Sequence, residues 1–194
     1  MKRILVFLCS CLFVLASLAV GSGATETRLT AREAFRLAQQ AVQAKHGDCI
    51  LFLVTGTQAL GAPTDGKLPV WKFRVFSKNA RKELEVEVEN GSARILKEKA
   101  VDSQEEFPPS DAVQWWMDNW KIDSQQAVAL SRSNGADTFL KSNPQVVMGL
   151  FLGPHKGAGK WSLTWGWKIL YMVPGKDSLT IEIDGSSGQL IRKG

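Results

Sequence analysis

The sequence predicts an α+β fold of two tandem repeats, in each of which one helix packs on a three- to four-stranded antiparallel sheet. The main observation is a pair of similar hairpins, LEVEVENGSARILKEK at residues 84–99 and LTIEIDGSSGQLIRKG at residues 179–194. Each hairpin follows a strand that contains Trp-Lys-hydrophobic and, further upstream, a helix cap. Equivalent elements lie 93 to 96 residues apart, and this nearly constant offset indicates an internal repeat.

The N-terminus has the order of a secretory signal peptide, with Lys2 and Arg3 before an apolar run and small residues at its end. Cleavage after Ala24 is the favoured interpretation, and it predicts a periplasmic or secreted protein with no stable membrane insertion. Residues 4–20 also reach the lower limit of a spanning helix, so a chain tethered through an uncleaved N-terminal segment is the alternative.

Charge argues against a nucleic-acid partner. Removal of residues 1–24 lowers the formal net charge from +5 to +3, and the remaining Lys and Arg are interleaved with Glu and Asp along the predicted strands. A dedicated nucleic-acid surface normally shows a clustered basic stripe. The sequence therefore predicts a solvated surface of mixed charge and not a nucleic-acid surface.

The first repeat is predicted at residues 25–100. Thr30 and Glu33 form a T-x-x-E capping box, and apolar residues then recur every three or four positions as far as Val42, which predicts an amphipathic helix. The apolar run CILFLV and the alternating segments VWKFRVF and LEVEVE predict strands with one buried side. The turn at residues 89–92 is expected to close a hairpin.

Residues 101–121 are a predicted connector with a short Trp-rich helix at about 112–120, and the second repeat is predicted at residues 122–194. Asp123 is expected to cap a helix that ends at Asn134-Gly135, because glycine accepts the left-handed conformation found at helix ends. A short helical piece follows near residues 138–141. The strands then predicted are VVMGLFL, WSLTWGWKILYMV, LTIEID and QLIRK.

The segment from Ile181 to Leu190 resembles the closing hairpin of the PepSY domain family, and the segment from Val86 to Ile95 is a looser match. The looser match has Glu89 for the aspartate and Ala93 for the glycine of the pattern. The resemblance implies a PepSY/cystatin-like fold. It also implies an extracytoplasmic module, of a kind found in protease propeptides, where such modules are associated with inhibition.

Three residues of this hairpin have a predicted structural role. Asp184 is expected to accept hydrogen bonds from backbone amides just after it, and Gly185 and Gly188 to supply positive φ at low steric cost.

Residues that could carry chemistry do not form a catalytic or metal-binding pattern. His46 and His155 lack metal-ligand spacing, and GPHKGAGKWS departs from the phosphate-loop pattern. Cys49 is the one thiol left after removal of the leader and is expected to be a small buried hydrophobe. The sequence therefore predicts no enzyme activity, no metal and no cofactor.

Five tryptophans are the predicted binding residues. Trp161, Trp165 and Trp167 share one face of a predicted strand, and Trp116 and Trp120 lie in the connector. Such aromatics form either a core or an open surface that receives a protein or peptide. The second interpretation predicts an exported, non-catalytic binding module, with regulation or inhibition of an envelope or secreted protease as one form. A structural or assembly subunit of a cell-envelope complex is the alternative.

Overall fold

The strands form one continuous sheet in the computed structural model, which describes residues 26–102, 116–154, 165–176 and 178–194. In chain order they are β1 (Ile50–Gln58), β2 (Val70–Ser77), β3 (Lys82–Glu89), β4 (Ser92–Ala100), β5 (Val147–Pro154), β6 (Trp165–Met172), β7 (Leu179–Asp184) and β8 (Leu190–Lys193). Their order across the sheet is β4-β3-β2-β1-β5-β6-β7-β8, and every neighbouring pair is antiparallel.

The predicted fold of two tandem helix-on-sheet repeats, each with its own three- to four-stranded sheet, is therefore wrong. Strands β1 and β5 pair directly, with Val54 opposite Leu152 and Thr55 opposite Phe151. The physical reason is that β1 and β5 would each be an edge strand of a separate sheet, with a row of unpaired backbone groups. Pairing the two strands satisfies both rows at once.

Helix α1 (Ala31–His46) forms where the sequence predicts it. The Thr30 hydroxyl accepts from the Glu33 amide at 3.2 Å, while the Glu33 carboxylate accepts from the Thr30 amide at 2.8 Å. The helix ends at Gly47, whose φ is 84°. Its apolar stripe is buried against the half of the sheet that contains β2, β3 and β4, and Phe35 lies 5.7 Å from Phe73 between ring centroids.

Helix α3 (Ser124–Ser131) packs on β6 and β7 and is followed by a π-helical turn, η2 (Arg132–Ala136), and by α4 (Asp137–Ser142). The hydroxyls of Ser131 and Tyr171 lie 2.6 Å apart in the core. The predicted break at Asn134-Gly135 is confirmed, because Gly135 has a φ of 111° and interrupts the helical conformation. The chain can then turn from α3 into α4.

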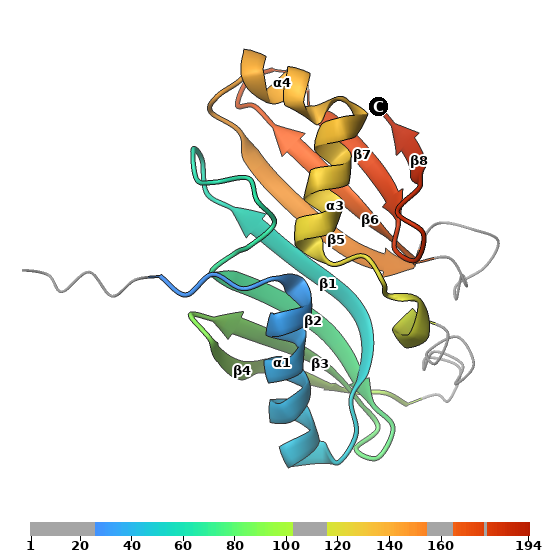
Figure 1. The fold of residues 1–194 in the computed structure, drawn as a ribbon. Helices are drawn as coiled ribbons and strands as arrows, with labels where there is room; N and C mark the ends of the chain where they lie inside the picture. Colours follow the sequence, from blue (N-terminus) through green and yellow to red (C-terminus); the bar gives the residue numbers. More distant parts are fainter. Residues whose placement is uncertain (1–25, 103–115, 155–164, 177) are drawn as a thin grey trace, which may run out of the picture.

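Helices α1 and α3 lie over the same face of the sheet (Figure 1). Core side chains point toward that face from the six inner strands, for example Trp71 and Phe73 on β2 and Ile181 and Ile183 on β7. The opposite face carries no helix among the described residues and is called the open face below. No helix in the described part of the chain is long and apolar enough to cross a bilayer.

The N-terminal ends of α1 and α3 meet at one point. Asp123 Oδ1 accepts from the amides of Ser124, at 2.7 Å, and Arg32, at 3.1 Å, and Ser124 Oγ accepts from the amide of Ala31 at 2.9 Å. Asp123, the N-cap of α3, and Ser124, its first residue, thus satisfy two amides that α1 leaves unpaired at its first turn. This junction fixes the two helices relative to each other.

The predicted hairpin turns form, with one correction. Asn90 and Gly91 have φ of 49° and 80°, as a two-residue hairpin loop requires. Asp184 Oδ1 accepts from the amides and hydroxyls of both Ser186 and Ser187 at 2.6 to 3.0 Å. Gly188 has the expected positive φ of 75°, but Gly185 does not. Gly185 is needed for space, since a Cβ there would lie 2.9 Å from the carbonyl oxygen of Trp165.

Candidate functional site

Four of the five predicted binding tryptophans lie in the core. Trp116, Trp120, Trp165 and Trp167 are at most 6% exposed, and the rings of Trp116 and Trp165 are 5.1 Å apart. Trp161 lies outside the described residues. These positions agree with the core interpretation of the tryptophans, because side chains buried in this way present no surface to a partner.

The connector tryptophan Trp120 ties the two helix regions to the sheet. The indole N–H groups of Trp120 and Trp167 both donate to the carbonyl of Ile122, at 3.0 and 2.8 Å. The guanidinium of Arg32 lies over the Trp120 ring, 5.4 Å from its centroid, and donates to the Trp120 carbonyl. The role of this residue is thus to hold the junction of α1 and α3 together.

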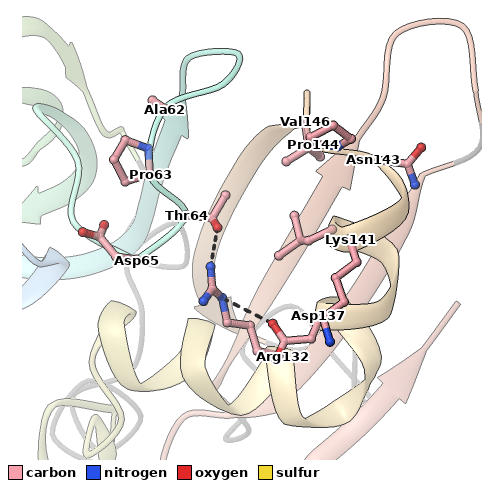
Figure 2. Close-up of a pocket in the computed structure, with 11 residues that line it drawn as sticks. Ala62, Pro63, Thr64, Asp65, Arg132, Asp137, Lys141, Asn143, Pro144 and Val146 are labelled. Atoms are coloured by element: carbon pink, nitrogen blue, oxygen red, sulfur yellow. Dashed lines mark hydrogen bonds and ion pairs between the residues drawn. The ribbon is translucent and has the colours of Figure 1, made fainter.

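A crevice of about 450 Å³ opens between the loop that joins β1 to β2 and the segment η2–α4 (Figure 2). Residues 62–65 form one wall and residues 132–146 contribute the other. Its lining comprises Ala62, Pro63, Thr64, Asp65, Arg132, Asp137, Leu140, Lys141, Asn143, Pro144 and Val146. Its volume is in the range of small-ligand and peptide-residue pockets.

Arg132 bridges the two walls of the crevice. Its guanidinium donates to Thr64 Oγ1 at 2.7 Å across the opening, and its Nε lies 3.9 Å from Asp137 Oδ1 on its own side (Figure 2). The kink at Gly135 places Arg132 and Asp137 on neighbouring turns, one on each side of the break. A π-type turn of this kind is often found at functional sites.

The loop wall is itself held in place by Arg28. The guanidinium of Arg28 donates to both carboxylate oxygens of Asp65, at 2.7 and 3.1 Å, and to the carbonyls of Pro63 and Lys67. Burial alone would raise the pKa of Asp65, but hydrogen bonds from the Lys67 amide and from Arg28 outweigh it and hold the pKa below its ordinary value. Asp65 is therefore ionised, and the charge of Arg28 balances its negative charge.

Lys141 brings a second cation to the lining of the crevice, beside Arg132. In the part of the chain that the structure describes, it takes part in no ion pair, whereas Arg132 faces Asp137 and Asp65 is paired with Arg28. The remaining lining is largely apolar. The crevice can therefore hold a short apolar segment and offer one ammonium group to an anionic group on it.

Sequence reasoning did not find this crevice. Its walls are almost 70 residues apart in the chain, at Thr64 and Arg132, and they meet only because β1 pairs with β5. The signals in the sequence are the Gly/Pro-containing loop at residues 61–69 and the helix break at Asn134-Gly135, which by themselves predict only a loop and the end of a helix.

The other residues that could carry chemistry are Cys49 and the two histidines. Burial, with a contribution from the carboxylate of Asp48, raises the pKa of the Cys49 thiol to about 12, which leaves it almost entirely protonated at neutral pH. His46 lies 3.3 Å from Glu98 Oε1 at the end of α1. His155 lies outside the described residues, and within them no group of three or more His, Cys, Asp or Glu side chains could hold a metal ion.

Comparison with known proteins gives a similarity of fold. No protein-family model matches the chain, and no curated protein sequence matches it significantly. The crystal structure of a "putative lipoprotein" from Clostridium difficile 630 is similar to it, with a TM-score of 0.51 and 14% sequence identity. The match covers 83% of this chain and 91% of the clostridial one. At this identity the likeness concerns the fold alone.

Proposed function

We propose that this chain is an exported binding protein that recognises a peptide or a segment of another protein at the crevice between the 59–69 loop and η2–α4. The observation that carries the proposal is the position of Lys141, an unpaired cation, among the described residues, beside the apolar lining of the crevice. Export is supported by the leader pattern of residues 1–24 and is consistent with the name of the clostridial protein of similar fold.

The charges of the lining favour a segment that carries a carboxylate. Asp65 is neutralised by Arg28, and Asp137 faces Arg132, so Lys141 is the charge of the lining that no described residue pairs. The apolar side chains of Pro63, Leu140 and Val146 suit a short hydrophobic stretch beside that carboxylate. The ligand class is therefore an apolar peptide segment with an acidic side chain or a free C-terminus.

The PepSY resemblance of residues 181–190 suggests the finer proposal that the partner is an envelope or secreted protease. This form of the proposal is tested separately, by measuring the activity of envelope proteases with and without the purified chain. A fall in activity that the Lys141→Glu change abolishes is expected. Stoichiometric capture with unchanged protease activity would instead favour the role of an assembly subunit.

Binding at the crevice is tested with a peptide array and two charge-reversal variants. We expect bound peptides to share apolar residues beside an Asp, a Glu or a free C-terminus, and Lys141→Glu to weaken their binding by about tenfold or more. Lys121→Glu is the matched control, because Lys121 is exposed and lies outside the crevice. Equal effects of the two changes, or enrichment of basic peptides, would contradict the assignment of the crevice.

Export is tested by mapping the N-terminus of the chain in cells. Thr25 as the first residue of the mature protein agrees with cleavage after Ala24. Recovery of the protein with residues 1–24 intact in a membrane fraction would support the tethered alternative instead.

A further inference from the structure

The open face carries a row of alternating charge that crosses all eight strands. The strand registers place these residues side by side, in order from β4 to β8: Arg94, Glu87, Lys72, Thr55, Phe151, Lys168, Glu182 and Arg192. The two central positions are uncharged. On each side of them the row continues as a cation, an acid and a second cation, so the pattern is nearly the same in both directions.

The centre of this face is a strip of small and apolar residues along β1 and β5. We call it the central strip, and it consists of Leu53, Thr55, Thr57, Gly149, Phe151 and Gly153. Phe151 and Leu53 lie over two glycines: a Cβ on Gly149 would be 3.0 Å from the Phe151 ring, and one on Gly153 would be 2.9 Å from Leu53. The glycines thus let the larger side chains lie low on the sheet.

Cations border the central strip on both sides. Lys72 projects from β2 and Lys168 from β6, and both are exposed. Arg74 on β2 is already engaged, because its guanidinium donates to Glu83 and lies over the Phe52 ring. Acids of the face lie one strand further out, among them Glu83, Glu85 and Glu87 on β3 and Glu182 on β7. Glu87 accepts from Arg94 and lies 3.7 Å from Lys72. A partner seated on the central strip would therefore meet one lysine on each flank.

The dimensions of the strip fit an α-helix. Strands are about 4.8 Å apart, so a helix about 10 Å across covers two of them and places its flanks over the next strand on each side. The nine residues of β1 span roughly 30 Å, and a helix of about 18 residues, roughly 27 Å long, covers most of that length.

We propose that the central strip is a docking site for an amphipathic helix of another protein, whose narrow apolar stripe is flanked by acidic residues. The apolar stripe would lie on Leu53 and Phe151, and the acids would face Lys72 and Lys168. This surface is on the opposite side of the sheet from the helices, and the proposal does not rest on the crevice or its ligand.

Charge favours this partner over two others. If two copies stacked their open faces with aligned strands, the lysines beside the strip of one copy would lie over those of the other, which is repulsive. An anionic lipid surface would be repelled by Glu85, Glu87 and Glu182 on the same face. An acidic helix on the central strip would instead place its acids beside Lys72 and Lys168, the cations nearest to it.

The test uses a labelled, end-capped peptide of about 18 residues, with Leu at i, i+3 and i+7 positions and Glu on both flanks. We expect it to bind the full chain, to gain helical circular dichroism on binding, and to shift the backbone NMR signals of Thr55, Phe151 and Lys168. A peptide of the same composition in scrambled order is expected to bind at least about tenfold more weakly.

A pair of double variants locates the site. Lys72→Glu with Lys168→Glu is expected to weaken binding of the acidic peptide about tenfold or more. Lys121→Glu with Lys193→Glu makes the same charge change off the open face, since Lys193 is opposite the core residue Ile181, and is expected to have little effect. Thermal unfolding of both variants controls for folding.

Three results would overturn the proposal: equal binding of the scrambled peptide, equal weakening by the two double variants, or shifts confined to residues outside the central strip. A dimer of the chain, or adsorption to phosphatidylserine vesicles, that depends on Lys72 and Lys168 would assign the surface to a second copy or to a membrane instead.

Discussion

The carboxylate of Asp123, at the start of α3, accepts a hydrogen bond from the backbone amide of Arg32, in the first turn of α1, at 3.1 Å. The same oxygen accepts from the Ser124 amide at 2.7 Å, so one side chain caps two helices that belong to different halves of the sheet. Negative charge is favourable at both helix N-termini. The two halves are thus coupled on the helix side as well as through the β1–β5 pair.

Asp123→Ala should therefore destabilise the whole molecule. Loss of a single N-cap usually costs about 1 kcal/mol, and the loss of two from one substitution is expected to cost about 2 kcal/mol. Urea unfolding measures this change, with Asp102→Ala as an exposed control. A destabilisation no larger than that of the control would show that the shared cap has no energetic role.

The β1–β2 loop should respond very differently to alanine at two of its glycines. Gly61 and Gly66 both have positive φ, of 73° and 81°, but a Cβ on Gly66 would lie 2.5 Å from the Ser124 carbonyl oxygen, while one on Gly61 would meet nothing within 4 Å. The backbone strain is similar in both variants, so their difference isolates the clash. We expect Gly66→Ala to be less stable than Gly61→Ala by about 1–3 kcal/mol, measured by urea unfolding. Equal stabilities would mean that the loop does not pack on the start of α3.

Low pH should weaken the ion pairs through which Lys45 and His46 of α1 contact Glu98 of β4. Hydrogen bonds from Lys45 and Lys82, with a further contribution from His46, lower the pKa of Glu98 from 4.5 to about 2. Because the folded pKa is below the unfolded one, the stabilisation is present above about pH 4.5 and is lost as pH falls toward 2. Glu98→Gln should therefore flatten the loss of stability between pH 5 and pH 2 in urea titrations. An unchanged slope would contradict the assigned role of Glu98.

Cys49 should react slowly with alkylating reagents in the folded protein. With the thiol pKa raised to about 12, the thiolate fraction near pH 8 is about a thousandfold smaller than for a thiol at the ordinary value of 9.0. Mass spectrometry of the peptide that contains Cys49 after timed iodoacetamide treatment measures the rate, and the urea-unfolded chain is the control. Similar rates in the two states would show an accessible, ionised thiol.

Local elements could be predicted from the sequence, and the assembly of the sheet could not. The Thr30–Glu33 capping box, the helix break at Gly135 and the Asn90-Gly91 hairpin depend on residues close together in the chain, and all three formed as expected. Alternation along β1 and β5 shows which side of each strand is buried. It does not show which strand pairs with which, because strands pair through backbone groups that are the same in every sequence. The prediction of two separate sheets failed for that reason.

The candidate sites were missed for the same physical reason. The crevice and the central strip both depend on the β1–β5 pair, which brings Thr64 near Arg132 and places Thr55 beside Phe151. The tryptophans gave a strong signal because they are large and apolar, but that signal does not distinguish a core from a binding surface. Their burial shows that here it marked the core.

The pairing of β1 with β5 is the feature on which the crevice, the central strip and the single sheet all depend, and NMR of the labelled chain tests it most directly. We expect cross-strand nuclear Overhauser effects between Val54 and Leu152 and between Gly56 and Leu150, together with slow hydrogen exchange of β1 and β5 amides and one unfolding transition. Absence of these contacts, with fast exchange along β1 and β5 and separate unfolding of residues 26–102 and 116–194, would contradict it.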